Sequence, residues 1–137
     1  MGPLVLDASI AMTWCYPDEH SDFAYRVLDS LAHRQAVVPS LWAMEVANAL
    51  VVGERRQRLA ASDVARFWEL LNALSIETDT QTARRALSET LHLARTYGLS
   101  AYDAAYLELA MREGFVLATL DGRLKNAAKK AGGKIFA

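Results

Sequence analysis

The stretch Gly114-Phe115-Val116-Leu117-Ala118-Thr119-Leu120-Asp121 decides how the chain folds. Gly114 follows a helical pattern and is a suitable residue to end that helix. The run Phe115–Thr119 then predicts a short buried strand, because apolar side chains follow one another without polar alternation. Asp121 comes directly afterwards and can begin another helix. A helix, a buried strand and a helix in this order predict one unit of a parallel α/β sheet.

The same alternation continues along the whole chain. Short apolar runs predict strands at 3–6, 36–38, 75–78, 115–119 and 134–136, and the run at 75–78 is the weakest of them. Helical patterns lie between them at 8–16, 19–34, 41–57, 63–74, 80–97, 101–113 and 121–130, with Ser40, Ser62 and Ser100 as expected caps. Strands that alternate with helices are joined by right-handed crossovers. We therefore expect an α/β fold in which helices flank a short parallel sheet of four or five strands, in one domain over residues 1–137.

The composition is that of a globular protein in a reducing compartment. Apolar residues make up 53% of the chain and charged residues 23%, which excludes disordered and fibrous proteins. The single cysteine, Cys15, excludes a disulfide framework, and its free thiol favours the cytoplasm. No apolar run reaches the roughly 18 residues of a membrane span, and the N-terminus has no secretory signal, so we expect no membrane association.

Three acidic residues lie where a parallel α/β sheet binds its ligands, beyond the carboxyl ends of the strands. Asp7 and Asp121 follow predicted strands, and Asp103 lies in the first turn of a helix. Each also has a structural interpretation. Asp7 and Asp121 are suitable helix caps, and Asp103 can pair with the cap Ser100, three residues earlier. Taken one at a time, these capping roles are the more common use of aspartate.

A fourth acid, Glu45, interrupts a stretch at 41–52 that is otherwise almost wholly apolar. A buried carboxylate needs a cation, a hydrogen-bond donor or a water-filled cleft. Asn48 lies on the same helix face and can serve as the donor. Together with the three aspartates, Glu45 predicts a site for Mg²⁺ or Mn²⁺, because these hard cations prefer carboxylate oxygens. An acidic pocket that binds a divalent cation can hold and polarise a phosphate and generate hydroxide.

The acids and their neighbours resemble the motifs of the PIN-domain nucleases, and among them the VapC-type toxins of bacterial toxin–antitoxin pairs. Four motifs carry the resemblance in the family's order along the chain, namely Leu6-Asp7-Ala8-Ser9, Glu45-Val46-Ala47-Asn48, Ser100-Ala101-Tyr102-Asp103 and Ala118-Thr119-Leu120-Asp121. The resemblance implies a PIN-like α/β/α sandwich and an endoribonuclease that depends on Mg²⁺ or Mn²⁺. It places the metal on Asp7, Glu45, Asp103 and Asp121, with Ser9, Asn48, Ser100 and Thr119 as the polar neighbours of these acids.

The resemblance also implies an RNA substrate and a small cognate antitoxin that covers the site. The apolar stretch 41–52 independently predicts a protein partner, because a helix that is apolar nearly all round needs burial on more than one side. That partner is either the antitoxin or a second copy of the chain in a homodimer. Residues 54–137 carry thirteen of the fifteen Lys and Arg residues, and the candidates for contact with RNA phosphates are Arg84, Arg85, Arg123 and Lys125.

Two other functions stay open at this point. One is a metal-dependent phosphatase with an aspartate nucleophile at a strand end, although such sites usually place a second aspartate where this chain has Ser9. The other is a catalytically silent module that binds a cation and a protein. The sequence has no G-x-G-x-x-G or G-x-x-x-x-G-K-[ST] pattern, which argues against dinucleotide and Walker-type nucleotide binding.

Overall fold

A five-stranded parallel sheet forms the centre of the protein. The computed structural model describes residues 2–137, and the strands are β1 (Leu4–Leu6), β2 (Ala36–Val38), β3 (Ile76–Thr78), β4 (Val116–Ala118) and β5 (Lys134–Ile135). They lie in the order β3-β2-β1-β4-β5, and every neighbouring pair is parallel. The expected α/β fold with a short parallel sheet is confirmed, and the sheet has five strands.

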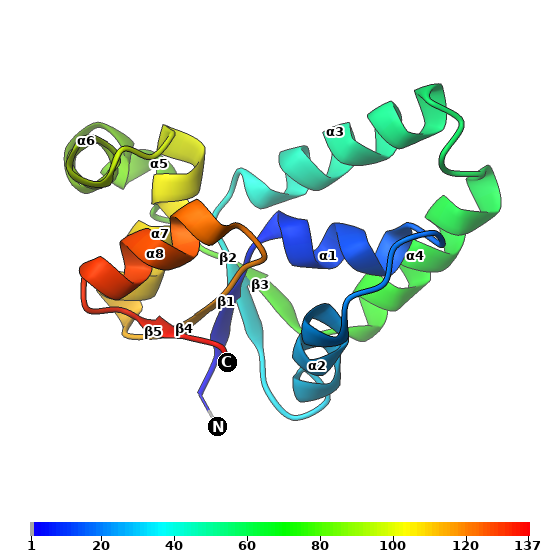
Figure 1. Cartoon of the computed structure of the whole chain (residues 1–137), viewed down its shortest axis with the longest axis horizontal. Coiled ribbons are helices and arrows are strands. Elements are labelled where there is room, and N and C mark those ends of the chain that lie inside the picture. Colours follow the sequence, from blue (N-terminus) through cyan, green and yellow to red (C-terminus); the bar gives the residue numbers. More distant parts are fainter. Residues whose placement is uncertain (1) are drawn as a thin grey trace.

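Helices flank the sheet on both sides. In chain order they are α1 (Ala8–Cys15), α2 (Asp22–Ser30), α3 (Trp42–Arg55), α4 (Ala61–Ala73), α5 (Thr82–Arg85), the π-helical turn η1 (Ala86–Thr90), α6 (Leu91–Tyr97), α7 (Ala101–Glu113) and α8 (Gly122–Lys130). Helices α1–α4 lie on one side of the sheet, and α5–α8 lie on the other (Figure 1). Within residues 2–137, no helix combines the length and the apolar character needed to cross a bilayer.

The middle of the sheet is also the middle of the hydrophobic core. Leu4, Val5 and Leu6 of β1 are fully buried between β2 and β4. Helix α7 packs against β1 and β4, and its residues 104–110 are all buried. Burying a Val or Leu side chain stabilises the fold by roughly 1.5–3 kcal/mol. Three-residue strands without polar alternation are therefore stable here because both of their faces are covered.

Three helix starts differ from the sequence prediction. Helix α2 begins only after Ser21, whose hydroxyl caps it, so it covers part of the expected helix at 19–34. Ser40 and Ser62 are not caps, because α3 begins after Leu41 and α4 begins one residue before Ser62. The carboxylate of Asp63 instead accepts a hydrogen bond from the backbone amide at the start of α4, over 2.9 Å. An acceptor within the first turn thus takes the role that the sequence assigned to a serine.

The helix expected at 80–97 contains a change of helical type. Its first turns are α5, and η1 then adds a π-helical turn before α6 begins. Gly98 ends α6 with a left-handed backbone at φ 65°, as expected, because glycine adopts this conformation without a steric penalty. Ser100 caps α7 as predicted, and its hydroxyl accepts from the Asp103 amide over 3.1 Å.

The strand order reverses beside β1. The chain passes from β1 outward to β2 and β3, returns to β4 on the other side of β1, and then continues to β5. In open parallel sheets a crevice forms at such a reversal, outside the carboxyl ends of the strands. Leu6 of β1 pairs with Ala118 of β4, so the residues that follow both strands enter this crevice together.

Candidate active site

Asp7 and Thr119 lie side by side in the crevice between the ends of β1 and β4. The Asp7 amide donates to the Ala118 carbonyl over 3.0 Å, which continues the pairing of the two strands by one step. The Thr119 hydroxyl donates to Oδ2 of Asp7 over 2.6 Å, and both side chains are buried. Asp7 precedes α1, but its side chain does not cap that helix. The Asp7 carboxylate is therefore free of a capping role and is bonded by the residue that follows β4.

Ser9 makes a second contact with the same carboxylate. Its hydroxyl donates to Oδ2 of Asp7 over 2.8 Å and accepts from the Leu120 amide over 3.3 Å. Burial raises the pKa of Asp7 above the ordinary aspartate value; hydrogen bonds from Thr119 and Ser9 offset part of this rise, and the charge of Asp121 adds to it. Two hydroxyls thus fix one oxygen of Asp7 in a site where its charge is costly.

Asp121 caps helix α8 and also borders the crevice. Its Oδ1 accepts from the backbone amides of Arg123 and Leu124 over 2.9 and 3.4 Å, as the capping interpretation predicts. Its own amide donates to the Thr119 hydroxyl over 3.0 Å. Thr119 therefore connects Asp121 with Asp7 through a single oxygen atom. The capping bonds involve Oδ1, and no hydrogen bond within residues 2–137 involves Oδ2 of Asp121.

Asp103 approaches the crevice from the first turn of α7. Ser100 bonds its backbone amide, so the carboxylate is not needed to complete the cap. Burial raises the pKa of Asp103, and the charges of Asp121 and then Asp7 raise it further; Arg123 acts in the opposite direction. These mutual effects show that the three aspartates lie within electrostatic reach of one another.

Glu45 enters from α3 and is held by a residue that the sequence analysis did not select. The hydroxyl of Tyr106, on α7, donates to Oε1 of Glu45. Burial raises the pKa of Glu45, while the Tyr106 hydroxyl lowers it and the charges of Asp7 and Asp103 raise it. Asn48, the expected donor, is exposed and forms no hydrogen bond with Glu45. Glu45 and Tyr106 are 61 positions apart in the chain, so no local pattern could have indicated this pair.

The four acids have no basic ion-pair partner in the described part of the chain, which includes every Lys, Arg and His. The donor set is therefore made of carboxylate oxygens with uncompensated charge, which fits a hard divalent cation. As placed, no three His, Cys, Asp or Glu side chains within residues 2–137 form a group that could hold one metal ion. Binding of an ion would thus require the carboxylates to move closer together than they lie here.

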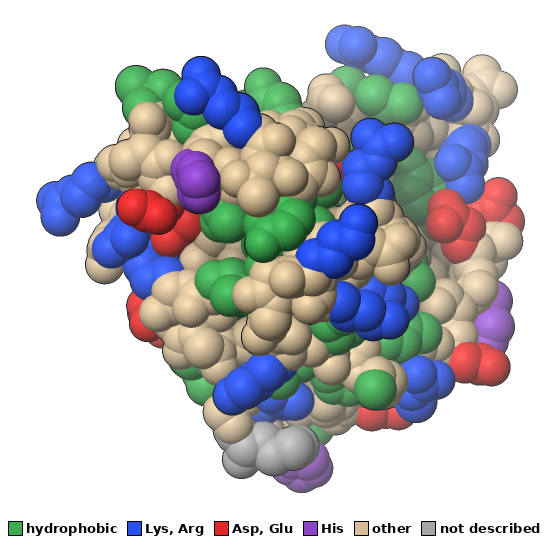
Figure 2. Space-filling model, turned by 60° about the vertical axis from the view of Figure 1, so that its left-hand side comes forward, with side chains coloured by type: hydrophobic (Ala, Val, Ile, Leu, Met, Phe, Trp, Pro, Cys, Tyr) green, Lys and Arg blue, Asp and Glu red, His purple; other side chains and the backbone are tan. Residues whose placement is uncertain are grey.

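The basic residues selected from the sequence differ in whether another group of the protein already contacts their charged ends. Arg85 lies 3.8 Å from the Glu108 carboxylate, and the ammonium group of Lys125 lies 5.1 Å above the centre of the Phe23 ring. Arg84 is exposed. Arg123 lies next to the acids. Figure 2 brings the side with α6 and α8 forward and shows several Lys and Arg side chains gathered on it.

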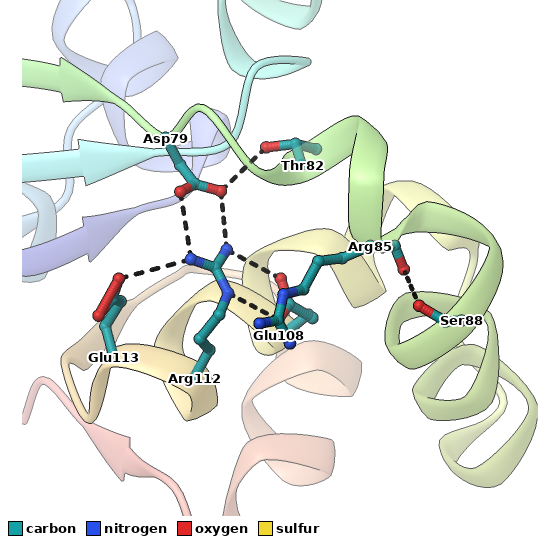
Figure 3. A network of polar contacts seen from close by, with 7 residues as sticks. All are labelled: Asp79, Thr82, Arg85, Ser88, Glu108, Arg112 and Glu113. Carbon is teal, nitrogen blue, oxygen red and sulfur yellow. Dashed lines mark hydrogen bonds and ion pairs between the residues drawn. The ribbon is translucent and has the colours of Figure 1, made fainter.

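A second charged cluster connects α7 with the residue that follows β3. It consists of Arg112 and Glu108 of α7 and Asp79. The guanidinium of Arg112 bonds both oxygens of Asp79, over 2.7 and 3.2 Å, and both oxygens of Glu108, over 2.9 and 3.0 Å (Figure 3). Burial acts to raise the pKa of Asp79, but the hydrogen bonds and charge of Arg112 leave it lowered. In this cluster the acids have a buried basic partner, so it lacks the uncompensated charge of the crevice.

An apolar groove lies between α3 and α4, next to the helix that carries Glu45. Its volume is about 220 Å³, and its lining residues are Trp42, Ala43, Val46, Ala47, Leu50, Val64, Phe67, Trp68 and Leu71. Trp68, which lines the groove, is 64% exposed. The stretch 41–52 therefore buries only part of its apolar surface within this chain.

Comparisons with known proteins agree with this fold. A family model described as PIN domain matches residues 4–130. The chain is 34% identical over 125 residues to a protein named Ribonuclease VapC3 from Pyrobaculum aerophilum, which covers 88% of this chain and 91% of the relative.

Solved structures show the same likeness. The crystal structure of PAE2754 from Pyrobaculum aerophilum has a TM-score of 0.70 and 27% identity, covering 97% of this chain and 82% of that one. VapBC2 from Rickettsia felis, solved bound to a DNA fragment from its promoter, has a TM-score of 0.64 and 16% identity, covering 90% and 92% of the two chains. At this low identity, the second structure supports the fold alone.

Proposed function

Because the chain belongs to the PIN-domain family, we propose that it is a Mg²⁺- or Mn²⁺-dependent endoribonuclease and the toxin of a toxin–antitoxin pair. One observation carries the proposal. Four carboxylates without a basic partner lie within electrostatic influence of one another near the reversal of strand order, in a chain that is 34% identical to a named ribonuclease. The same chain offers no Ser–His or Cys–His pair at this crevice within the described residues, so the acids are the groups available for chemistry.

Asp7, Glu45, Asp103 and Asp121 would hold the ion. A bound Mg²⁺ or Mn²⁺ supplies polarisation of the scissile phosphate and a water whose pKa is lowered. The protein's own residues keep the carboxylates in position: Thr119 and Ser9 hold Asp7, and Tyr106 holds Glu45. Hydrolysis by water leaves 5′-phosphate and 3′-hydroxyl ends and does not use the ribose 2′-hydroxyl, so no histidine pair is required.

Cleavage of a labelled RNA by the purified chain tests this function. We expect cleavage with Mg²⁺ or Mn²⁺, none with EDTA, and a loss of at least a hundredfold in Asp103→Asn, which removes one carboxylate and little volume. Asp22→Asn is the matched control, because Asp22 is exposed on α2. Turnover of p-nitrophenyl phosphate without RNA cleavage would indicate a phosphatase instead. Metal binding without either activity would indicate a silent binding module.

The α3–α4 groove is the surface on which a cognate antitoxin would bind. Its apolar lining and the exposed Trp68 fit the apolar face of a partner helix. Purification after co-expression with a candidate antitoxin tests this: we expect a complex with the parent and none with Trp68→Glu. A complex that forms equally well with Trp68→Glu would contradict the assignment.

A homodimer is the second part of the partner proposal, since a second copy can cover the apolar surface that the antitoxin leaves free. Light scattering across a range of concentrations tests it. We expect the mass of two chains, and a strict monomer at high concentration would contradict the dimer. The function also places the protein in the cytoplasm, where its RNA substrate is found.

A further inference from the structure

A hollow between α6 and α8 lies beside the acidic crevice. Its volume is about 560 Å³, and it is lined by Thr96, Tyr97, Arg123, Asn126, Ala127 and Lys130. Arg123 connects the two sites. Its backbone amide donates to Oδ1 of Asp121 over 2.9 Å, and the residue also lines the hollow. One end of the hollow therefore lies two residues along the chain from Asp121.

The lining has the chemistry of an anion site. Positions 123, 126, 127 and 130 recur at helical spacing, so they form one face of α8, and the face carries two cations and an amide. No acidic residue contributes to the lining. A neighbouring hollow, lined in part by Arg85, Glu89, Glu108 and Arg112, contains cations that are already bonded to acids. The α6–α8 hollow is therefore the better place for phosphate groups.

We propose that the α6–α8 hollow holds the RNA strand next to the scissile bond, with Arg123 and Lys130 on two separate, non-adjacent backbone phosphates and Tyr97 stacked on a base. This inference rests on the proposed nuclease function. Seven residues of α8 separate the two cations, which is about 10 Å along the helix axis. At roughly 3.4 Å of rise per stacked nucleotide, this distance corresponds to about three nucleotides.

Tyr97 supplies the contact that favours an unpaired strand. Its ring is half-buried where α6 ends, and it forms part of the hollow opposite α8. An aromatic ring beside a basic track is the usual arrangement for single-stranded nucleic acids, because every base can stack on it. A double helix keeps its bases stacked inside, so the hollow predicts that single-stranded segments or loops are the substrate.

Lys130 and Lys129 provide a matched pair of variants. Both are exposed in the last turn of α8, but only Lys130 lines the hollow. We expect Lys130→Ala to raise the KM for a single-stranded RNA roughly threefold to tenfold with little change in kcat. Its binding should also depend less on salt, with a log–log slope about 0.7 smaller, as expected for one lost phosphate contact. Lys129→Ala should resemble the parent in both measurements.

Tyr97 is tested with two substitutions of similar size. Tyr97→Leu should weaken RNA binding about fivefold or more through the loss of stacking, while Tyr97→Phe keeps the ring and should bind as the parent does. Thermal melts of both variants show whether the fold is intact. If Tyr97→Leu and Tyr97→Phe bind equally well, the stacking role is wrong.

A small phosphodiester separates failure of the hollow from failure of the function. Bis-p-nitrophenyl phosphate has no nucleotides beyond its ester bonds, so Lys130→Ala should lose less activity toward it than toward RNA. RNA cleavage by the parent with identical KM values for Lys130→Ala and Lys129→Ala overturns the hollow and leaves the nuclease function standing. RNA that is bound but not cleaved by the parent overturns the nuclease function, and the binding data still decide the hollow. A parent that neither binds nor cleaves RNA overturns both.

Discussion

The Thr119 hydroxyl lies 2.6 Å from Oδ2 of Asp7, although the two residues are 112 positions apart in the chain. The contact follows from the sheet, because Leu6 of β1 pairs with Ala118 of β4 and each strand ends at that residue. Asp7 and Thr119 are the next residues after the two strands. The same hydroxyl accepts from the Asp121 amide over 3.0 Å. One threonine thus joins the ends of two strands and the start of α8, and it positions two of the four candidate ligands.

Thr119→Val should damage this junction while keeping the shape of the side chain. The substitution removes the donor to Asp7 and the acceptor for the Asp121 amide inside a buried site, which should cost about 1–3 kcal/mol of unfolding free energy. RNA cleavage should fall as well, since Asp7 loses a contact that positions it. Thr119→Ser keeps the hydroxyl and should retain most of the activity. Urea unfolding and a cleavage assay measure both effects, and a Val variant equal to the Ser variant would show that the hydrogen bonds do not matter.

Stability in EDTA should depend on pH through the crowded acids. Burial raises the pKa of Asp7, Glu45 and Asp103 in the folded protein. The stability that such groups contribute is present below their unfolded pKa of about 4 and is lost as the pH rises through the folded pKa. Thermal melts in EDTA should therefore show a gain when the pH falls from 7.5 toward 5. The effect of Asp79 on stability has the opposite dependence on pH, because its pKa is lowered in the folded protein. Its contribution is present above an unfolded pKa of about 4 and is lost as the pH falls below that value.

Asp7→Asn tests the origin of that dependence. At pH 7.5 in EDTA the variant should be at least as stable as the parent, since it loses a charge that the fold holds at a cost. Its melting temperature should also rise less than that of the parent when the pH falls from 7.5 toward 5. The two proteins differ only at position 7, so the difference between the two melting curves reports Asp7. Parallel curves for the parent and Asp7→Asn would contradict the raised pKa.

Arg112 should be far more important for stability than an arginine in a surface pair. It is the buried partner of Asp79 and Glu108 in the cluster of Figure 3. Arg112→Met leaves the half-buried Asp79 without a cation and the buried Glu108 with only the more distant Arg85, which should cost up to about 3–5 kcal/mol. Arg66 pairs with Asp63 in an exposed position, and Arg66→Met should cost less than about 1 kcal/mol. Equal losses for the two variants in urea unfolding would show that burial of the cluster has no energetic effect.

The backbone around the site could be predicted because its signals are local. The buried run at 115–119, the glycine that ends α6 and the serine that caps α7 each act within a few residues. The sheet register then brings Asp7 and Thr119 together without further information. Ser40 and Ser62 were wrong as caps, since other residues begin those helices.

The side-chain partners could not be predicted because they come from distant parts of the chain. Tyr106 reads as one more apolar residue of α7, and only the tertiary fold brings its hydroxyl to Glu45 of α3. Arg112 similarly reads as a solvated residue of a helix, and its partner Asp79 lies 33 positions away. Arg85 and Lys125 were selected by charge alone, while the structure shows each beside a competing group.

Calorimetric titration with Mn²⁺ tests the central claim most directly, namely that the acids of the crevice form a divalent cation site. The parent should bind Mn²⁺ saturably, Asp103→Asn should bind at least tenfold more weakly, and the exposed control Asp22→Asn should bind as the parent does. Absence of saturable binding to the parent at millimolar Mn²⁺, or equal affinity in the parent and Asp103→Asn, would contradict the account.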